Sequence, residues 1–347
     1  MDEAEQPKEG PPMKLGRIAV SGPDGEEIRV VAAEPEHDRV IDLKKAYALA
    51  LQKGGATVEG SRHLAHATFR DLTQGVSSGD FFLEAAHKAL DAADDASLPL
   101  GDADFRAAIK PPVLRDSLTF NGHIKNFFGN VMKSKPTRAV YERPGFFKGS
   151  TATLYGTNET IPYPSITEKL DYELEIGYVI GKPGRNLAPE EAFDHVFGIT
   201  IFNDWSLRDV QVLENPIGMG AQHSKDFAYG IGPWIVTLDE IDSIIGLTGQ
   251  VRVNGEIWSD TKVEDFIWTP EETVSYVSQF DGLQPGDLIG SGTMAFGAGA
   301  ELQKFLQPGD VLELELEKVG VLRSPIATEK EEPGWWPTPQ PFPFEED

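Results

Sequence analysis

The segment LDYELEIGYVIG, residues 170–181, carries a large apolar residue at every second position, which is typical of a buried β-strand. The opposite face begins with Asp171, Glu173 and Glu175. Side chains two residues apart point the same way in a strand, so these three carboxylates would lie about 7 Å apart. Like charges at this spacing need either solvent or a cation between them. A solvent-facing strand of an acidic protein is the simpler interpretation, and a cation site is the alternative.

The composition limits the classes of function. The 347 residues suffice for one large domain, or for a large and a small one. Lys and Arg number 31 against 56 Asp and Glu, a net charge of −25 that argues against nucleic acid as a partner. The absence of cysteine excludes disulfides, thiolate metal sites and cysteine nucleophiles. No segment approaches the roughly 20 continuous apolar residues of a membrane helix, so a soluble, cytoplasmic protein without a membrane partner is expected.

Four regions follow one another along the chain. The acidic stretch 1–13 and the Pro- and Glu-rich stretch 329–347 are typical of disordered tails. Residues 14–110 predict a small α/β N-terminal domain, with a hairpin over 14–34 and helices near 40–54 and 78–96. Residues 111–328 predict the main domain.

The main domain is expected to be mostly β with α+β elements. Its runs of β-branched and aromatic residues, such as GITIFND (198–204), are short and are broken by Gly and Pro. Asn254-Gly255 indicates a hairpin turn, and helices are expected near 188–195 and 270–280. The chain has neither GxGxxG nor a Walker phosphate loop, which disfavours nucleotide binding.

Several residues could carry chemistry. Asp204 ends an apolar run, where a carboxylate is costly unless it is paired or coordinated. Carboxylates from several segments, without Cys or clustered His, suit Mg²⁺, Ca²⁺ or Mn²⁺ rather than zinc. His123 follows Asp116 in a loop punctuated by Gly and Asn and is a candidate general base, with a structural or surface histidine as the alternative.

Polar residues after Asp204 suggest a site for developing negative charge. Arg208 and Gln211 follow Asp204 by four and seven positions, which predicts one shared face of a helical turn. Together with Lys225 they could stabilise negative charge on a substrate oxygen. A surface ion pair between Arg208 and Asp209 is the alternative.

Five motifs in the same order resemble the fumarylacetoacetate hydrolase family over roughly residues 113–326. They correspond to the family's loop with an acidic residue and the catalytic histidine, its ExE strand, its NDWSARD segment, its GKxF-to-GPW segment and its SGT loop. In this chain they read RDSLTFNGH (115–123), YELEIGYVIGK (172–182), FNDWSLRDVQ (202–211), SKDFAYGIGPWIV (224–236) and GSGTMAFGAGAEL (290–302).

The resemblance implies a mixed β-roll behind a small N-terminal domain, commonly as a homodimer. It also implies that four carboxylates bind a divalent cation, usually Mg²⁺ or Ca²⁺, with Mn²⁺ possible as well. Asp171 is outside this set and is expected at the solvent-facing start of the strand. The four implied ligands are Asp116, Glu173, Glu175 and Asp204.

The resemblance further implies hydrolysis of a C–C bond in a 1,3-diketo or 2,4-dioxo acid of aromatic catabolism. His123, oriented by Glu301, would activate water, while the substrate would be held by Arg208, Gln211, Lys225 and Thr293. Isomerisation or decarboxylation of hydroxymuconate-type diacids on the same scaffold is one alternative. A non-catalytic protein that only binds metal or ligand is the other.

This chain departs from the family's animal enzyme where that enzyme holds the carboxylates of its substrate with tyrosine and arginine. The corresponding positions or regions here contain Leu118, Met132 and Lys133, Phe146 and Phe147, and Asn215. The departures predict a related oxo acid rather than fumarylacetoacetate as the substrate.

Overall fold

The segment that contains Glu175 lies in the middle of a large mixed sheet. In the computed structural model, which describes residues 12–22, 25–341 and 343, β11 (Leu174–Ile180) pairs antiparallel with β12 (Val196–Asp204) and β17 (Leu288–Gly290). Every residue of β11 is buried, because both faces of the sheet are covered. The predicted tails lie largely outside the described residues at the N-terminus and partly so at the C-terminus.

The large sheet joins the expected N-terminal unit to the main domain. Its strand order is β4-β3-β2-β1-β14-β12-β11-β17-β6-β7, with β5 on β1 and β8 on β14. The predicted hairpin over 14–34 is present, and its first strand pairs with β14 through Lys14–Val236 and Leu15–Ile235. The remaining strands are β1 (Lys14–Gly22), β2 (Gly25–Glu34), β3 (Arg39–Asp42), β4 (Ser97–Pro99), β5 (Asp104–Phe105), β6 (Leu114–Leu118), β7 (Gly145–Gly149), β8 (Leu154–Tyr155) and β14 (Tyr229–Thr237).

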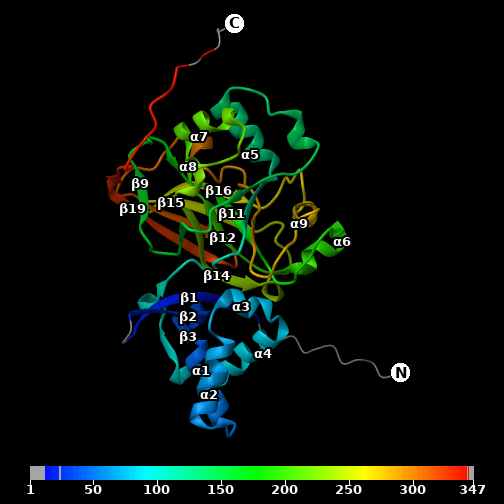
Figure 1. The fold of residues 1–347 in the computed structure, drawn as a ribbon, viewed down its shortest axis with the longest axis vertical. Coiled ribbons are helices and arrows are strands. Elements are labelled where there is room, and N and C mark those ends of the chain that lie inside the picture. Colours follow the sequence, from blue (N-terminus) through cyan, green and yellow to red (C-terminus); the bar gives the residue numbers. More distant parts are fainter. Residues whose placement is uncertain (1–11, 23–24, 342, 344–347) are drawn as a thin grey trace.

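A second sheet, in the order β16-β15-β18-β19-β9, packs against the first to close the roll (Figure 1). Asn254 and Gly255 both have positive φ at its predicted hairpin turn. A large apolar cluster that includes Ile176, Val251 and Leu314 contains residues of both sheets. The β-rich fold class is thus confirmed. The strands are β9 (Ile161–Pro164), β15 (Thr248–Val253), β16 (Glu256–Lys262), β18 (Val311–Leu316) and β19 (Gly320–Glu331), with the short pair β10 (Leu170–Asp171) and β13 (Ser206–Leu207) beside them.

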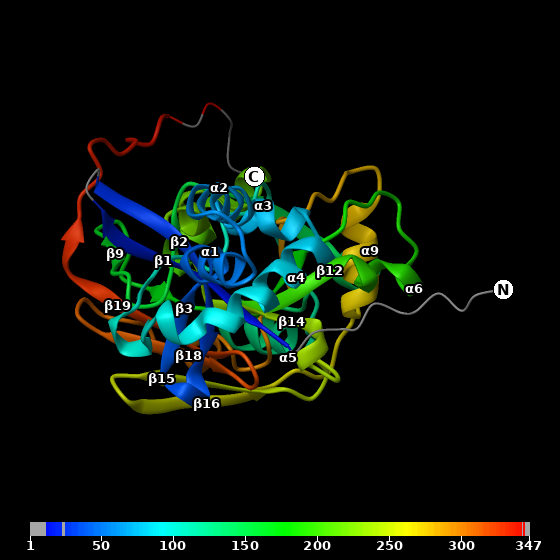
Figure 2. The ribbon, with the colours of Figure 1, turned by 90° about the horizontal axis from the view of Figure 1, so that it is seen from below.

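Helices cover the outer face of the large sheet and one end of the roll. Phe69 and Phe82 of the N-terminal unit share a core cluster with Val179, Phe202 and Ile231 of the sheet, and Figure 2 shows these helices from below. None of the helices in the described part of the chain has the length and apolarity that crossing a bilayer demands. The helices are α1 (Leu43–Lys53), α2 (Val58–Thr68), α3 (Leu72–Ser77), α4 (Asp80–Ala89), α5 (Asn121–Asn126), α6 (Pro189–Ala192), α7 (Arg208–Glu214), α8 (His223–Asp226), α9 (Pro270–Ser278) and α10 (Gly299–Leu302).

A buried ion pair anchors β6, the strand that carries Asp116. Arg115 is 1% exposed, and its Nη1 lies 2.9 Å from Oδ2 of the fully buried Asp287. Replacing Asp287 by alanine should lower the free energy of unfolding by about 3–5 kcal/mol, because it leaves a buried guanidinium without its main partner. Urea unfolding measures this loss. The control is Asp281→Ala, which removes the 40%-exposed second partner of Arg115 and should have an effect below about 1 kcal/mol; equal losses would contradict the assignment.

Candidate active site

The predicted site residues meet in one cavity of about 390 Å³ at the end of the roll that carries α5, α7 and α8 (Figure 1). Strands of the large sheet contribute Asp116, Glu175 and Asp204, whereas Glu173 lies just before β11. The three helices contribute the histidine and the cations. Glu301 does not line the cavity and lies behind His123. The predicted residues that do line it are Asp116, His123, Glu173, Glu175, Asp204, Arg208, Gln211, Lys225 and Thr293.

Three buried carboxylates form a cluster within the cavity. One oxygen from each of Asp116, Glu175 and Asp204 lies within 4.8 Å of the other two. These residues come from β6, β11 and the end of β12. Gly290 on β17 lies between Asp116 and Glu175, and a Cβ there would lie 2.4 Å from Asp116 Oδ1 and 2.9 Å from Glu175 Oε2. The absence of a side chain at this position is what allows the two carboxylates to approach each other.

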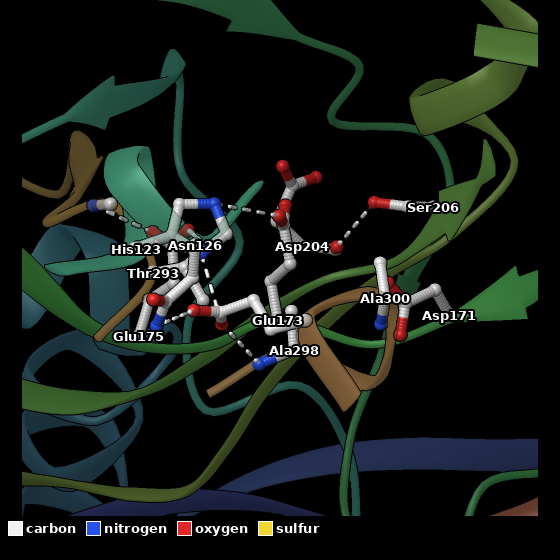
Figure 3. A network of polar contacts seen from close by, with 12 residues as sticks. His123, Asn126, Asp171, Glu173, Glu175, Asp204, Ser206, Thr293, Ala298 and Ala300 are labelled. Carbon is white, nitrogen blue, oxygen red and sulfur yellow. Dashed lines mark hydrogen bonds and ion pairs between the residues drawn. The ribbon is translucent and has the colours of Figure 1, made fainter. Parts of the chain in front are cut away.

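The segment Gly290–Thr293 holds Glu175 in place. The Gly292 N–H donates to Glu175 Oε2 at 2.8 Å. The Thr293 hydroxyl donates to Glu175 Oε1 at 3.2 Å, and both of these residues are labelled in Figure 3. Gly292 has φ +83°, and a Cβ there would lie 2.8 Å from the Ser117 carbonyl oxygen. Asp116 is also held by a backbone group, since its Oδ1 accepts a hydrogen bond from the Ser117 N–H at 2.8 Å.

Burial makes the charged form of these carboxylates costly, and a bound cation would offset that cost. Burial raises the pKa of Asp116 and of Glu175 well above their ordinary values, and burial also raises that of Asp204 although Lys225 opposes it. Within the described residues no group donates a hydrogen bond to the buried Asp204 Oδ1. Three carboxylate oxygens close together, one of them without a hydrogen bond, are the kind of ligand set that a hard divalent cation such as Mg²⁺, Mn²⁺ or Ca²⁺ prefers.

Glu173, the fourth ligand implied by the resemblance, points toward cationic side chains instead of joining the cluster. Its Oε1 accepts from Arg208 Nη2 at 2.8 Å, and its Oε2 accepts from Lys225 Nζ at 2.5 Å. Lys225 also donates to Asp204 Oδ2. Burial alone would raise the pKa of Glu173, but Arg208 and Lys225 hold it well below its ordinary value. The pKa values of both cations are raised, so both are charged.

Asp171 is not solvent-facing, and the expectation that it marks an exposed strand start is wrong. It is fully buried, accepts a hydrogen bond from Arg208 Nε at 2.7 Å through Oδ2, and accepts another from Ala300 N–H at 3.1 Å. Arg208 therefore lies between Asp171 and Glu173. The alternation in the DYELE run placed these carboxylates on one face, but it did not show that an arginine far along the chain neutralises two of them.

The predicted helical face that joins Asp204 to Arg208 is also wrong. Asp204 ends β12, and the helix begins only at Arg208. Gln211 nevertheless contacts the arginine, since Arg208 Nη1 donates to Gln211 Oε1 at 3.2 Å. Asp209 does not pair with Arg208 and instead accepts a hydrogen bond from the Thr167 hydroxyl at 2.5 Å.

His123 and Glu301 lie in the arrangement of a general base and its orienting carboxylate. His123 Nδ1 is 3.1 Å from Glu301 Oε2, and Nε2 is 3.7 Å from Glu173 Oε1 (Figure 3). Glu301 is held by the N–H groups of Phe296 and Ala298 and by the side-chain amide of Asn126 at 3.0 Å. Asn126 was not predicted as a site residue. It lies three residues after His123, one turn along α5, so predicting a helix through His123 would have placed both side chains on the same face.

Comparison with known proteins agrees with this arrangement of motifs. Residues 113–327 match the family described as fumarylacetoacetate (FAA) hydrolase C-terminal. The chain belongs to the fumarylacetoacetate hydrolase family. An uncharacterised protein of Staphylococcus aureus (strain USA300) is 33% identical over 256 residues, which cover 71% of this chain and 81% of that protein.

Two solved structures share the fold. The maleylpyruvate hydrolase of Sphingobium sp. SYK-6, in complex with manganese(II) and pyruvate, is 21% identical with a TM-score of 0.65 and covers 91% of this chain and 99% of its own. The 2-hydroxyhepta-2,4-diene-1,7-dioate isomerase of Mycobacterium marinum is 22% identical with a TM-score of 0.62 and covers 93% and 100%. Proteins described as hydrolases and proteins described as isomerases therefore share this fold.

Proposed function

We propose that this protein is a divalent-cation-dependent hydrolase that cleaves a C–C bond in a 1,3-diketo or 2,4-dioxo acid. The observation that supports this most strongly is the position of His123. Backed by Glu301 at 3.1 Å, it lines the same cavity as the cluster of Asp116, Glu175 and Asp204. A protein that only binds a metal or a ligand would not need a base with an orienting carboxylate.

In this proposal His123 removes a proton from water. Glu301 Oε2 lies 3.1 Å from Nδ1, so Nε2 is the nitrogen that would accept the proton. The water oxygen then bonds to the C4 carbonyl carbon of the dioxo acid. The bond between C3 and C4 breaks, its electron pair leaves as the enolate of a 2-oxo acid, and that enolate takes up a proton. The products are a carboxylic acid and a 2-oxo acid, with one water consumed.

The cations stabilise the negative charge that develops in this reaction. Arg208 and Lys225 are buried, charged and directed at the cavity. Asp116, Glu175 and Asp204 would hold the divalent cation, and Glu173 could join them if it turned away from the two cationic side chains. When bound, the cation supplies Lewis-acid polarisation of substrate oxygens. The Sphingobium enzyme, which is described in complex with manganese(II) and pyruvate, supports a divalent cation and a 2-oxo acid as ligands of this site.

A substrate panel tests the reaction. The purified chain is incubated with 2,4-dioxo acids and with hydroxymuconate-type diacids, each with Mn²⁺ or Mg²⁺ and each with EDTA, and the products are identified. Cation-dependent release of a carboxylic acid and a 2-oxo acid is the expected result. Conversion of the diacids without C–C cleavage would favour the isomerase alternative, to which the likeness in fold to the M. marinum enzyme points.

Cation binding should stabilise the fold more strongly as the pH rises. The raised pKa values of Asp116, Glu175 and Asp204 mean that the folded chain keeps protons there at pH values where the unfolded chain has released them. Without a cation, the free energy of unfolding therefore falls as the pH rises from the ordinary carboxyl range through these raised values. A bound cation replaces the protons, so its stabilising effect grows over that interval.

Thermal unfolding with Mn²⁺ and with EDTA measures this effect. At about pH 8, with free cation at about 100 times its Kd, we expect about 2.7 kcal/mol of stabilisation, and clearly less at about pH 5. Glu175→Gln serves as the control and should show little response to Mn²⁺. An equal shift at both pH values would contradict cation binding at these carboxylates.

A further inference from the structure

The cavity has a second half that the proposed reaction does not use. Beyond the carboxylates and cations, six of its lining residues have large apolar side chains, and four of these are phenylalanines. They lie on β6, on the neighbouring edge strand β7, and on α5 and the helical turn Phe127–Met132 that follows it. These residues are Leu118, Ile124, Phe127, Phe128, Phe146 and Phe147.

The apolar half directly adjoins the reacting groups. Phe147 is paired with Asp116 and Phe146 with Ser117 across the β6–β7 ladder. From the helical side, the ring of Phe127 lies 5.8 Å from that of His123 and 5.3 Å from the Arg208 guanidinium carbon. A substrate held at the carboxylates and His123 must therefore place one end against these rings.

The positive charges that line the cavity are already engaged. Arg208 is bound between Asp171 and Glu173, and Lys225 between Glu173 and Asp204. The described lining residues include no other lysine or arginine. Because both cations are already paired, a carboxylate placed beside Phe146 and Phe147 would lose water without gaining a free cationic partner. An alkyl or aryl group there would gain from burial.

We infer that the substrate is a 2,4-dioxo acid with a single carboxylate and an alkyl or aryl group at the far end of its acyl part. This inference rests on the proposed function. Phe127, Phe146 and Phe147 are then the residues that determine specificity, and each methylene buried against them should raise kcat/KM roughly fourfold. A diacid of equal length should be a poor substrate.

A matched substrate pair tests the inference on the unaltered protein with Mn²⁺. The pair is 2,4-dioxooctanoate and 2,4-dioxooctanedioate, which differ only in the terminal methyl or carboxylate group. We expect kcat/KM to be roughly 100-fold higher for the octanoate. Cleavage of both with equal efficiency, or a preference for the diacid, would overturn the inference and leave the proposed hydrolase intact. Cleavage of neither, together with no turnover of short dioxo acids, would overturn the proposed function itself.

A charge placed in the apolar half provides a second test. Phe146 is 37% exposed on an edge strand, so Phe146→Arg can be accommodated and would supply a partner for a terminal carboxylate. The preference for the octanoate should fall at least about tenfold. The control Ile245→Arg places the same charge at a 56%-exposed position outside the cavity lining and should leave the preference unchanged. An unchanged preference in a folded Phe146→Arg protein would contradict the assignment of this wall.

Discussion

Replacing His123 with alanine should lower kcat by about 10²–10⁴-fold, because in the proposed reaction this side chain takes a proton from water. The side chain is buried at the cavity wall, with Nδ1 3.1 Å from Glu301 Oε2 and Nε2 3.7 Å from Glu173 Oε1. It is not part of the cluster of Asp116, Glu175 and Asp204. Cation affinity should therefore stay close to that of the unaltered protein. Steady-state kinetics and calorimetric titration with Mn²⁺ on the same preparation measure the two quantities.

The control for His123→Ala is His63→Ala, which alters an exposed histidine of α2 on the N-terminal unit and should change neither quantity. Glu301→Gln gives a graded comparison, since it weakens the orientation of the ring without removing the base. Its loss of kcat should be smaller than that of His123→Ala. Turnover retained in His123→Ala would exclude this histidine as the base.

The second large effect is expected from Glu175→Gln, which should reduce divalent-cation affinity by at least about 100-fold and abolish cation-dependent turnover. Glutamine has nearly the same shape, and its carbonyl oxygen can still accept one of the hydrogen bonds from Gly292 and Thr293. The negative charge is lost, and the neutral amide oxygen that remains is a weaker ligand for a hard cation than a carboxylate. Loss of a partner outside the ligand set typically weakens metal binding only 10–100-fold.

Asp287→Asn provides a matched control for Glu175→Gln. It also replaces a fully buried carboxylate by its amide, but Asp287 lies outside the cluster and pairs with Arg115. The variant should lose stability and retain its cation. Equal Mn²⁺ affinity in Glu175→Gln and in the unaltered chain would mean that the cation, if one binds, is held elsewhere.

Much of the fold followed from local pattern. The alternation in residues 170–181 predicted one buried strand, which the structure divides into β10 and β11. Asn254-Gly255 predicted the hairpin turn between β15 and β16. The helix over 270–280 follows from Thr269 and Pro270, since Thr269 accepts a hydrogen bond from Glu272 N–H as an N-cap. The pairing of β1 with β14 could not be predicted, because the register of strands more than 200 residues apart is set by packing rather than by local sequence.

The residues of the site could be predicted from the sequence, but which carboxylates pair with which cations could not. Asp204 stood out because a carboxylate at the end of an apolar run needs a partner. That Asp171 is buried, and that Glu173 turns toward Arg208 and Lys225, depends on where the chain brings these cations back to the sheet. The sequence also could not show that Gly290 makes room for Asp116 and Glu175, because that role depends on which residues the fold places around the glycine.

The central claim is that Asp116, Glu175 and Asp204 hold a divalent cation beside His123. The most direct test is anomalous scattering from a crystal of this protein soaked in Mn²⁺, with data collected at the manganese edge. We expect one strong peak per chain within bonding distance of oxygens from all three carboxylates. No peak at this cluster at saturating Mn²⁺, or a peak only at surface carboxylates, would contradict it.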